Sequence, residues 1–109
     1  MLWLDHLAHV FGGVFFANTI PHLVNGISGR PFQSPFSSPP GRGLSSSLLN
    51  VVWGLINLVI GYFLVLRVGN FDLRDTGDII AFGVGFALMA IALSRAFGRF
   101  HGGNNPLSK

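Results

Sequence analysis

The residues that could carry chemistry are amides and imidazoles set inside apolar stretches. Asn18, His22 and Asn25 recur at helical spacing and share one face at about 100° per residue. Asn50 and Asn57 share a face of a later stretch in the same way. An unpaired amide in hydrocarbon is costly, so such groups bind a polar ligand or one another. Two interpretations stay open: a site for a polar headgroup or small polar substrate, and interhelical hydrogen bonding.

Four histidines are the candidate metal or haem ligands, and the absence of cysteine excludes thiolate sites. His6 and His9 form a His-x-x-His pair without an evident third ligand, which is a weak metal signal. A bis-histidine haem needs two facing ligands at similar depth, and only His22 and His101 could meet in that way. Because His101 lies in a glycine-rich tail, we expect hydrogen-bonded histidines and neither a metal nor a haem cofactor.

The segment between the two polar faces, residues 26–46, could bind an anion. It carries Arg30 and Arg42, and Ser46 precedes the next apolar stretch. Backbone N–H groups at a helix start, together with arginine, favour phosphate, so a bound phospholipid is the natural ligand. The Gly-Arg-Gly motif around Arg42 matches no nucleotide-binding fingerprint. The alternative is that the arginines only flank membrane helices and the serine only caps one.

Catalysis is hard to build from these residues. No Ser–His–Asp order or acid pair is present, and no carboxylate lies within an apolar stretch. The acids lie at helix ends or in a turn: Asp5, Asp72, Asp75 and Asp78. Asp75 followed by Asp78 predicts an N-cap and a first-turn acid at the start of the third helix. We therefore do not expect an enzyme, and the lack of a membrane-embedded acid also argues against a proton-coupled exporter.

The composition indicates a membrane protein. Half of the 109 residues are hydrophobic and 10% are charged, against about 25% in soluble domains. The net charge of +3 comes from scattered basic residues that form no patch, so nucleic-acid binding is not expected.

The apolar stretches predict one all-α integral membrane domain with three transmembrane helices. A loop rich in Gly, Pro, Ser and Phe joins the first two, and we expect it to be ordered at the membrane surface. The predicted ranges are helices at about 2–24, 48–68 and 79–97, the loop at 26–46, and a flexible tail at 98–109.

Small residues predict how these helices pack. Gly54 and Gly61 share the face of Asn50 and Asn57, so this stripe should face protein. The third helix carries two small-residue faces, which allow it to pack on two sides, one of them toward another subunit. The first face comprises Gly83, Ala87, Ala90 and Ser94, and the second comprises Ala81, Gly85, Ala92 and Ala96.

The basic residues also predict orientation. The loop and tail carry Arg30, Arg42, Arg95, Arg99 and Lys109, whereas the other side carries Arg67 and Arg74 beside all four acids. The positive-inside rule then places the N-terminus outside and the C-terminus in the cytoplasm. We expect a bacterial inner membrane, although spans of this length suit organellar membranes equally well.

These patterns favour a structural or accessory subunit of a homo-oligomer or larger membrane complex that binds lipid at its cytoplasmic loop. One alternative is a small channel or carrier, formed by oligomerisation and lined by the Asn and His side chains. A third is a haem-bearing electron-transfer subunit. The expected partners are membrane lipids and other membrane subunits, including further copies of the chain.

Overall fold

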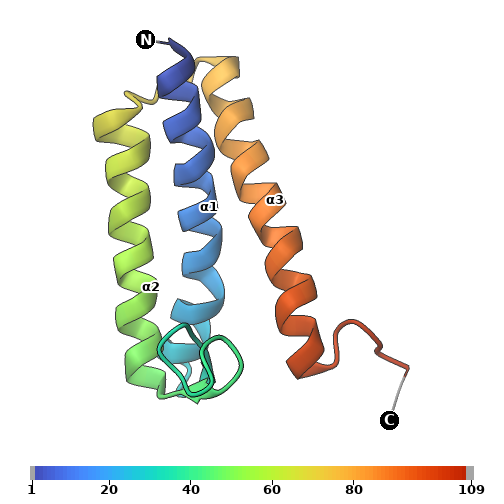
Figure 1. Ribbon diagram of the computed structural model, residues 1–109. Helices are drawn as coiled ribbons and strands as arrows, with labels where there is room; N and C mark the ends of the chain where they lie inside the picture. Colours follow the sequence, from blue (N-terminus) through green and yellow to red (C-terminus); the bar gives the residue numbers. More distant parts are fainter. Residues whose placement is uncertain (1, 108–109) are drawn as a thin grey trace.

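The computed structural model describes residues 2–107 and consists mainly of three helices (Figure 1). Helix α1 spans Leu2–Ile27, α2 spans Ser47–Tyr62 and continues as the π-helical segment η1 (Phe63–Val68), and α3 spans Thr76–His101. Each of the three is long and apolar enough to cross a membrane. The prediction of a mainly helical chain with three membrane-length helices is confirmed.

The ends of the helices follow local capping chemistry. Asp75 caps α3 as its position predicted, accepting hydrogen bonds from the backbone N–H groups of Gly77 at 2.8 Å and Asp78 at 3.4 Å. Residues 98–101, which we predicted as flexible tail, belong to α3 instead. The helix stops at Gly102, whose φ of 83° suits a glycine C-cap. The predicted tail also includes Lys109, which lies outside the described residues.

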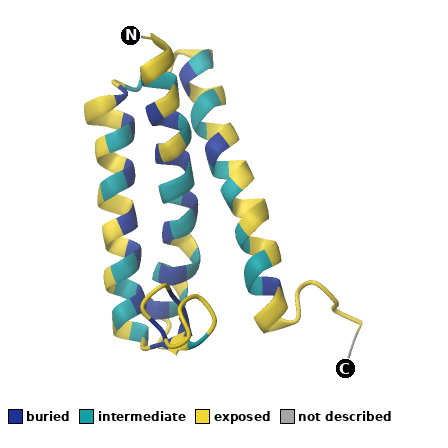
Figure 2. Ribbon diagram, viewed as in Figure 1, coloured by how far each residue is buried: buried dark blue, intermediate teal, exposed yellow. Residues whose placement is uncertain are grey.

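Helix α1 is the central element of the bundle. It packs along both α2 and α3, whereas α2 and α3 make at most marginal contact with each other in the described part of the chain. Figure 1 shows α3 diverging from α1 toward the C-terminal end of α3. Buried residues lie on the facing sides of α1 and α2, and most of α3 is exposed (Figure 2). A helix that buries so little within its own chain has most of its apolar surface available to lipid or a partner.

Glycines allow the helices to approach closely. A Cβ on Gly54 would lie 3.0 Å from the backbone nitrogen of Leu23, and one on Gly61 would lie 3.0 Å from the ring of Phe16. On α3, a Cβ on Gly85 would collide with the backbone of Val10. These positions bring α2 and α3 against α1 at backbone distance, which only small residues permit.

The first small-residue face of α3 does not take part in this packing. Its members Gly83, Ala87, Ala90 and Ser94 are all exposed. A Cβ on Gly83 would meet no atom within 4 Å. Within one chain, the second face, through Gly85, packs on α1. Use of the first face between chains therefore stays a prediction.

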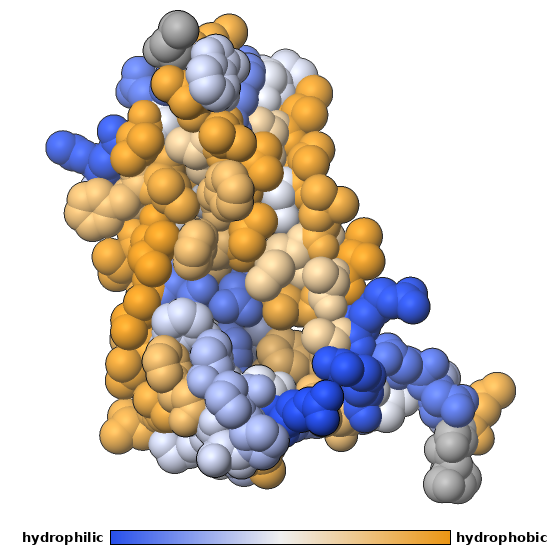
Figure 3. All heavy atoms as spheres, viewed as in Figure 1, coloured by the Kyte–Doolittle hydropathy of each residue, from blue (hydrophilic) through white to orange (hydrophobic). Residues whose placement is uncertain are grey.

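The loop between α1 and α2 contains a short antiparallel pair of strands, β1 (Phe32–Gln33) and β2 (Leu44–Ser45). The hydroxyls of Ser34 and Ser45 are hydrogen-bonded at 2.5 Å beside this pair, and both residues are buried. The loop lies at the same end of the bundle as the C-terminal end of α3 (Figure 1). Figure 3 shows apolar side chains over most of the visible face and hydrophilic ones gathered at this end.

Candidate functional site

The polar site is organised by one amide at the start of α2. Asn50 is fully buried, and its Nδ2 donates to the carbonyls of Phe32 at 3.1 Å, Ser45 at 3.3 Å and Ser46 at 3.0 Å. These bonds orient the amide, so its Oδ1 accepts from Nδ1–H of His22 at 2.7 Å. One side chain thus joins α1, both loop strands and α2.

This bond defines what the other ring nitrogen of His22 can do. In the neutral ring, a proton on Nδ1 leaves a lone pair on Nε2, which accepts no hydrogen bond from the described residues. The ring is 2% exposed and is contacted edge-on by Phe32, Trp53 and Phe97, with centroids 5.7, 6.4 and 5.9 Å away. His22 therefore holds an unused acceptor within an aromatic enclosure.

A second bonded pair lies one helical turn nearer the middle of the bundle. Nδ2 of Asn18 donates to Oδ1 of Asn57 at 3.0 Å, and Nδ2 of Asn57 donates to the carbonyl of Trp53 at 2.8 Å. Asn57 is 1% exposed. The two polar faces inferred from the sequence do meet, and for Asn57 the geometry favours the packing interpretation because its amide is satisfied within the chain.

A pocket of about 250 Å³ lies beside these two pairs; it is called the polar pocket here because Asn18, His22, Gln33 and Ser34 are among its lining residues, although most of its accessible wall is apolar. Its wall includes the indole of Trp53, whose Nε1–H is buried without an acceptor among the described residues. His22 and Trp53, each with one ring nitrogen that bonds to none of the described residues, are therefore both lining residues of one pocket, and the indole Nε1 itself is buried within the wall. The lining comprises Asn18, His22, Gln33, Ser34, Pro35, Gly41, Trp53, Met89, Leu93 and Phe97.

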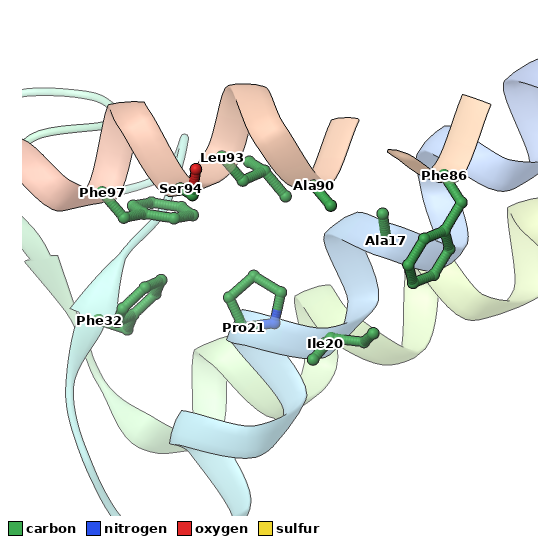
Figure 4. Close-up of a pocket in the computed structure, with 9 residues that line it drawn as sticks. All are labelled: Ala17, Ile20, Pro21, Phe32, Phe86, Ala90, Leu93, Ser94 and Phe97. Atoms are coloured by element: carbon green, nitrogen blue, oxygen red, sulfur yellow. The ribbon is translucent and has the colours of Figure 1, made fainter. Parts of the chain in front are cut away.

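An apolar groove adjoins the polar pocket. It has a volume of about 310 Å³ and lies between α1 and α3 where the helices diverge. Figure 4 shows Leu93 and Ala90 of α3 pointing toward Pro21 and Ile20 of α1. Leu93 and Phe97 line both the groove and the pocket. The remaining lining residues of the groove are Ala17, Phe32, Phe86 and Ser94.

The remaining predicted binding residues lie apart from the pocket. Asn25 donates to the carbonyl of Pro21 at 2.7 Å and accepts from Nε of Arg30 at 3.0 Å, so it does not join the amide network. Ser46 caps α2, accepting from the backbone N–H of Leu49 at 3.1 Å. Arg30 and Arg42 are exposed at the loop surface.

The two histidines considered for haem are each engaged by protein. Nε2 of His101 lies 2.8 Å from Oε1 of Gln33, and Nδ1 of His22 donates to Asn50. The ring of Phe32 contacts both imidazoles, stacking on His101 at 5.0 Å. A hydrogen bond from Nδ1 leaves Nε2 of His22 free, so the expectation of hydrogen-bonded histidines without haem stays a prediction.

The opposite end of the bundle brings together residues that sequence reasoning did not combine. His6, His9 and Asp78 form a cluster there. Asp78 was interpreted only as an acid in the first turn of α3. The sequence could have indicated this cluster through topology, because the first and third helices of a three-helix membrane chain start at the same side of the membrane.

Comparison of the chain with protein-family models, with curated proteins and with solved structures finds no match. Its function is therefore argued from the geometry of these sites.

Proposed function

We propose that this chain is an integral membrane accessory subunit that binds a phospholipid at its loop end. The observation that carries the proposal is that an apolar groove and a polar pocket adjoin, with Leu93 and Phe97 among the lining residues of both. A phospholipid has the same division, with an acyl chain for the groove and a polar headgroup for the pocket.

The groove suits an acyl chain because its walls are almost wholly apolar and it opens on the side of the bundle. The groove lies where α3 leaves α1, and its lining side chains come from these two helices and from Phe32 (Figure 4). An acyl chain in this groove supplies the van der Waals contacts that the two helices lose where they diverge.

The polar pocket suits polar headgroup atoms. The free Nε2 of His22 can accept from a headgroup hydroxyl or ammonium, and Asn18, Gln33 and Ser34 add polar side chains to the same wall. The same end of the bundle carries the arginines of the loop and of the last turns of α3, and these attract a phosphate and anionic lipid. Their excess over the opposite end supports a cytoplasmic location for the loop.

The test is native mass spectrometry of the full chain extracted in mild detergent from membranes of known lipid composition. Ala90→Trp fills the groove from α3, whereas Ala92→Trp places the same side chain at an exposed position that does not line it. We expect retained phospholipid on the wild type and on Ala92→Trp, and loss of most of it from Ala90→Trp. Equal lipid retention by the two variants would show that this groove is not the lipid site.

We also propose that the chain self-associates. The support comes from the N-terminal half of the first small-residue face, Gly83 and Ala87, which is exposed. Gly83 and Ala87 are spaced four residues apart on α3 and are exposed, and Gly83 has open space around it. In membranes, this small-xxx-small spacing lets two helices approach at backbone distance. Ala90 and Ser94 on the same face line the lipid groove instead, so the two proposals use different parts of α3.

The channel alternative receives less support. A polar path needs amides that remain available to the transported species, whereas Asn57 and Asn50 have their amides bonded within one chain. We therefore retain the accessory subunit as the proposed function.

A further inference from the structure

Three potential metal ligands converge at the end of the bundle opposite the loop. His6 and His9 lie one turn apart near the start of α1, and Asp78 lies in the first turn of α3. Oδ1 of Asp78 is 3.0 Å from Nε2 of His6 and 3.5 Å from Nδ1 of His9. All three candidate ligand atoms lie within 4.8 Å of one another.

His9 is the informative member of this cluster. It is fully buried, and its Nε2 lies 2.7 Å from the carbonyl of Gly69. A carbonyl only accepts, so the proton of a neutral ring is on Nε2 and the lone pair is on Nδ1. Nδ1 has no hydrogen-bond partner among the described residues, and it faces the carboxylate of Asp78. Two buried acceptors that face each other are unfavourable unless a proton or a metal ion lies between them.

The distances favour a metal ion over an extra proton. A charge-assisted N–H···O bond is typically about 2.7–2.9 Å long, so 3.5 Å is too long for a proton held between His9 and Asp78. Zinc bonds of about 2.0–2.1 Å in tetrahedral geometry put neighbouring ligand atoms about 3.3 Å apart. The two separations from Oδ1 of Asp78, 3.0 and 3.5 Å, lie on either side of that value, and the two histidine nitrogens lie within 4.8 Å of each other.

Surrounding groups hold the ligands in place. The N–H of His9 opposite the free nitrogen donates to Gly69, which is the arrangement usual for metal-binding histidines. The other carboxylate oxygen of Asp78, Oδ2, accepts from the backbone N–H of Asp72 at 2.9 Å. Both partners belong to the turn between η1 and α3, so the turn orients the cluster.

We propose that His6, His9 and Asp78 bind one divalent first-row transition metal ion of the Zn²⁺ class. Two imidazole nitrogens and one carboxylate oxygen are a ligand set typical of such ions, and three protein ligands leave a position for water. The side chain of His6 is 32% exposed, so the ion enters from the aqueous surface. In the bound state Nε2 of His6 carries no proton, and the ring keeps its proton on Nδ1. The ion then links the start of α1 to the start of α3.

The proposal is tested with the full chain, purified in mild detergent through a tag that contains no histidine. After treatment with a chelator, Zn²⁺ alone is titrated by calorimetry, and Co²⁺ alone is added to record its visible absorption. We expect one Zn²⁺ per chain and the intense Co²⁺ bands of a tetrahedral site. His6→Ala and Asp78→Asn should each weaken Zn²⁺ binding by more than the ~10–100-fold typical of losing an outer-shell partner.

His101→Ala is the matched control, because it removes an imidazole at the opposite end of the bundle. It should bind Zn²⁺ as the wild type does. Circular dichroism checks that each variant is folded, and His6→Gln serves as a milder substitution. Wild-type binding that survives both His6→Ala and Asp78→Asn would overturn the proposal. So would a folded wild type that binds no more Zn²⁺ than the detergent blank, and this outcome would assign the cluster to hydrogen bonding alone.

Discussion

Nδ1 of His22 donates to Oδ1 of Asn50 across 2.7 Å, and this bond connects α1 to the first turn of α2. The amide of Asn50 also binds the carbonyls of Phe32 and Ser45, one on each strand of the loop. One buried side chain thereby ties both strands of a loop rich in glycine and proline to the bundle. That arrangement positions the walls of both the polar pocket and the lipid groove.

Asn50→Ala should destabilise the protein more than Asn57→Ala. Removing the Asn50 amide leaves the buried Nδ1–H of His22 and loop carbonyls without partners, at a cost of about 2–3 kcal/mol. Asn57 has two bonds, and its loss should cost about 1 kcal/mol. Thermal unfolding in one detergent measures both. Equal melting temperatures for the two variants would contradict the central role of Asn50.

Gly85→Leu and Gly83→Leu form a matched pair on one helix. A side chain at Gly85 must displace the backbone of Val10, so we expect a loss of about 3 kcal/mol or more. A side chain at Gly83 meets open space, so the folded monomer should keep its stability. Thermal unfolding compares the two, and a comparable loss from both would refute the assignment of the packing face.

Gly83→Leu has a second expected effect, on self-association. If two copies meet at Gly83 and Ala87, the added side chain separates their backbones and the oligomer dissociates. Energy transfer between labelled copies in lipid vesicles measures this, with Leu88→Ala as a control at an exposed position of the same helix. Unchanged energy transfer would remove this face from any interface between copies.

Phe32→Ala should be far more damaging than Phe36→Ala. Phe32 is 6% exposed and contacts the rings of His22, Phe97 and His101, so truncation should cost about 3–5 kcal/mol. Phe36 is 60% exposed, and its ring contacts one aromatic ring among the described residues, that of Trp53. Limited proteolysis of the loop and thermal unfolding compare them. Loss of loop protection in the Phe36 variant alone would show that the loop is anchored differently.

Reversing the charge of the loop should disturb the orientation of the chain in the membrane. Arg30→Glu with Arg42→Glu removes two of the basic residues that the positive-inside rule counts on the loop side. We expect a mixed or inverted population in a cysteine-accessibility map, with Arg67→Glu as a control that should reinforce the wild-type orientation. An accessibility map unchanged by the double substitution would contradict the orientation argument.

Several local features follow from the sequence because each depends on neighbouring residues only. Uninterrupted apolar stretches of membrane length form helices wherever water cannot satisfy the backbone. The caps Ser46 and Asp75 were readable because a short polar side chain before an apolar run satisfies the first free N–H groups. At about 100° per residue, Asn18 shares a face with His22 and Asn50 shares one with Asn57, and this periodicity sufficed to predict that two polar faces meet.

Only the tertiary structure decided which of these residues share a site. Asn25 lies on the predicted face but turns back to its own helix, and Asp78 turns from the helix dipole toward His6 and His9. The choice between the two small-residue faces of α3 depended on the rotation and tilt of that helix against Val10. Helical periodicity specifies which side chains share a face. The facing partner is set by the way whole helices pack, because that depends on contacts between residues distant in sequence.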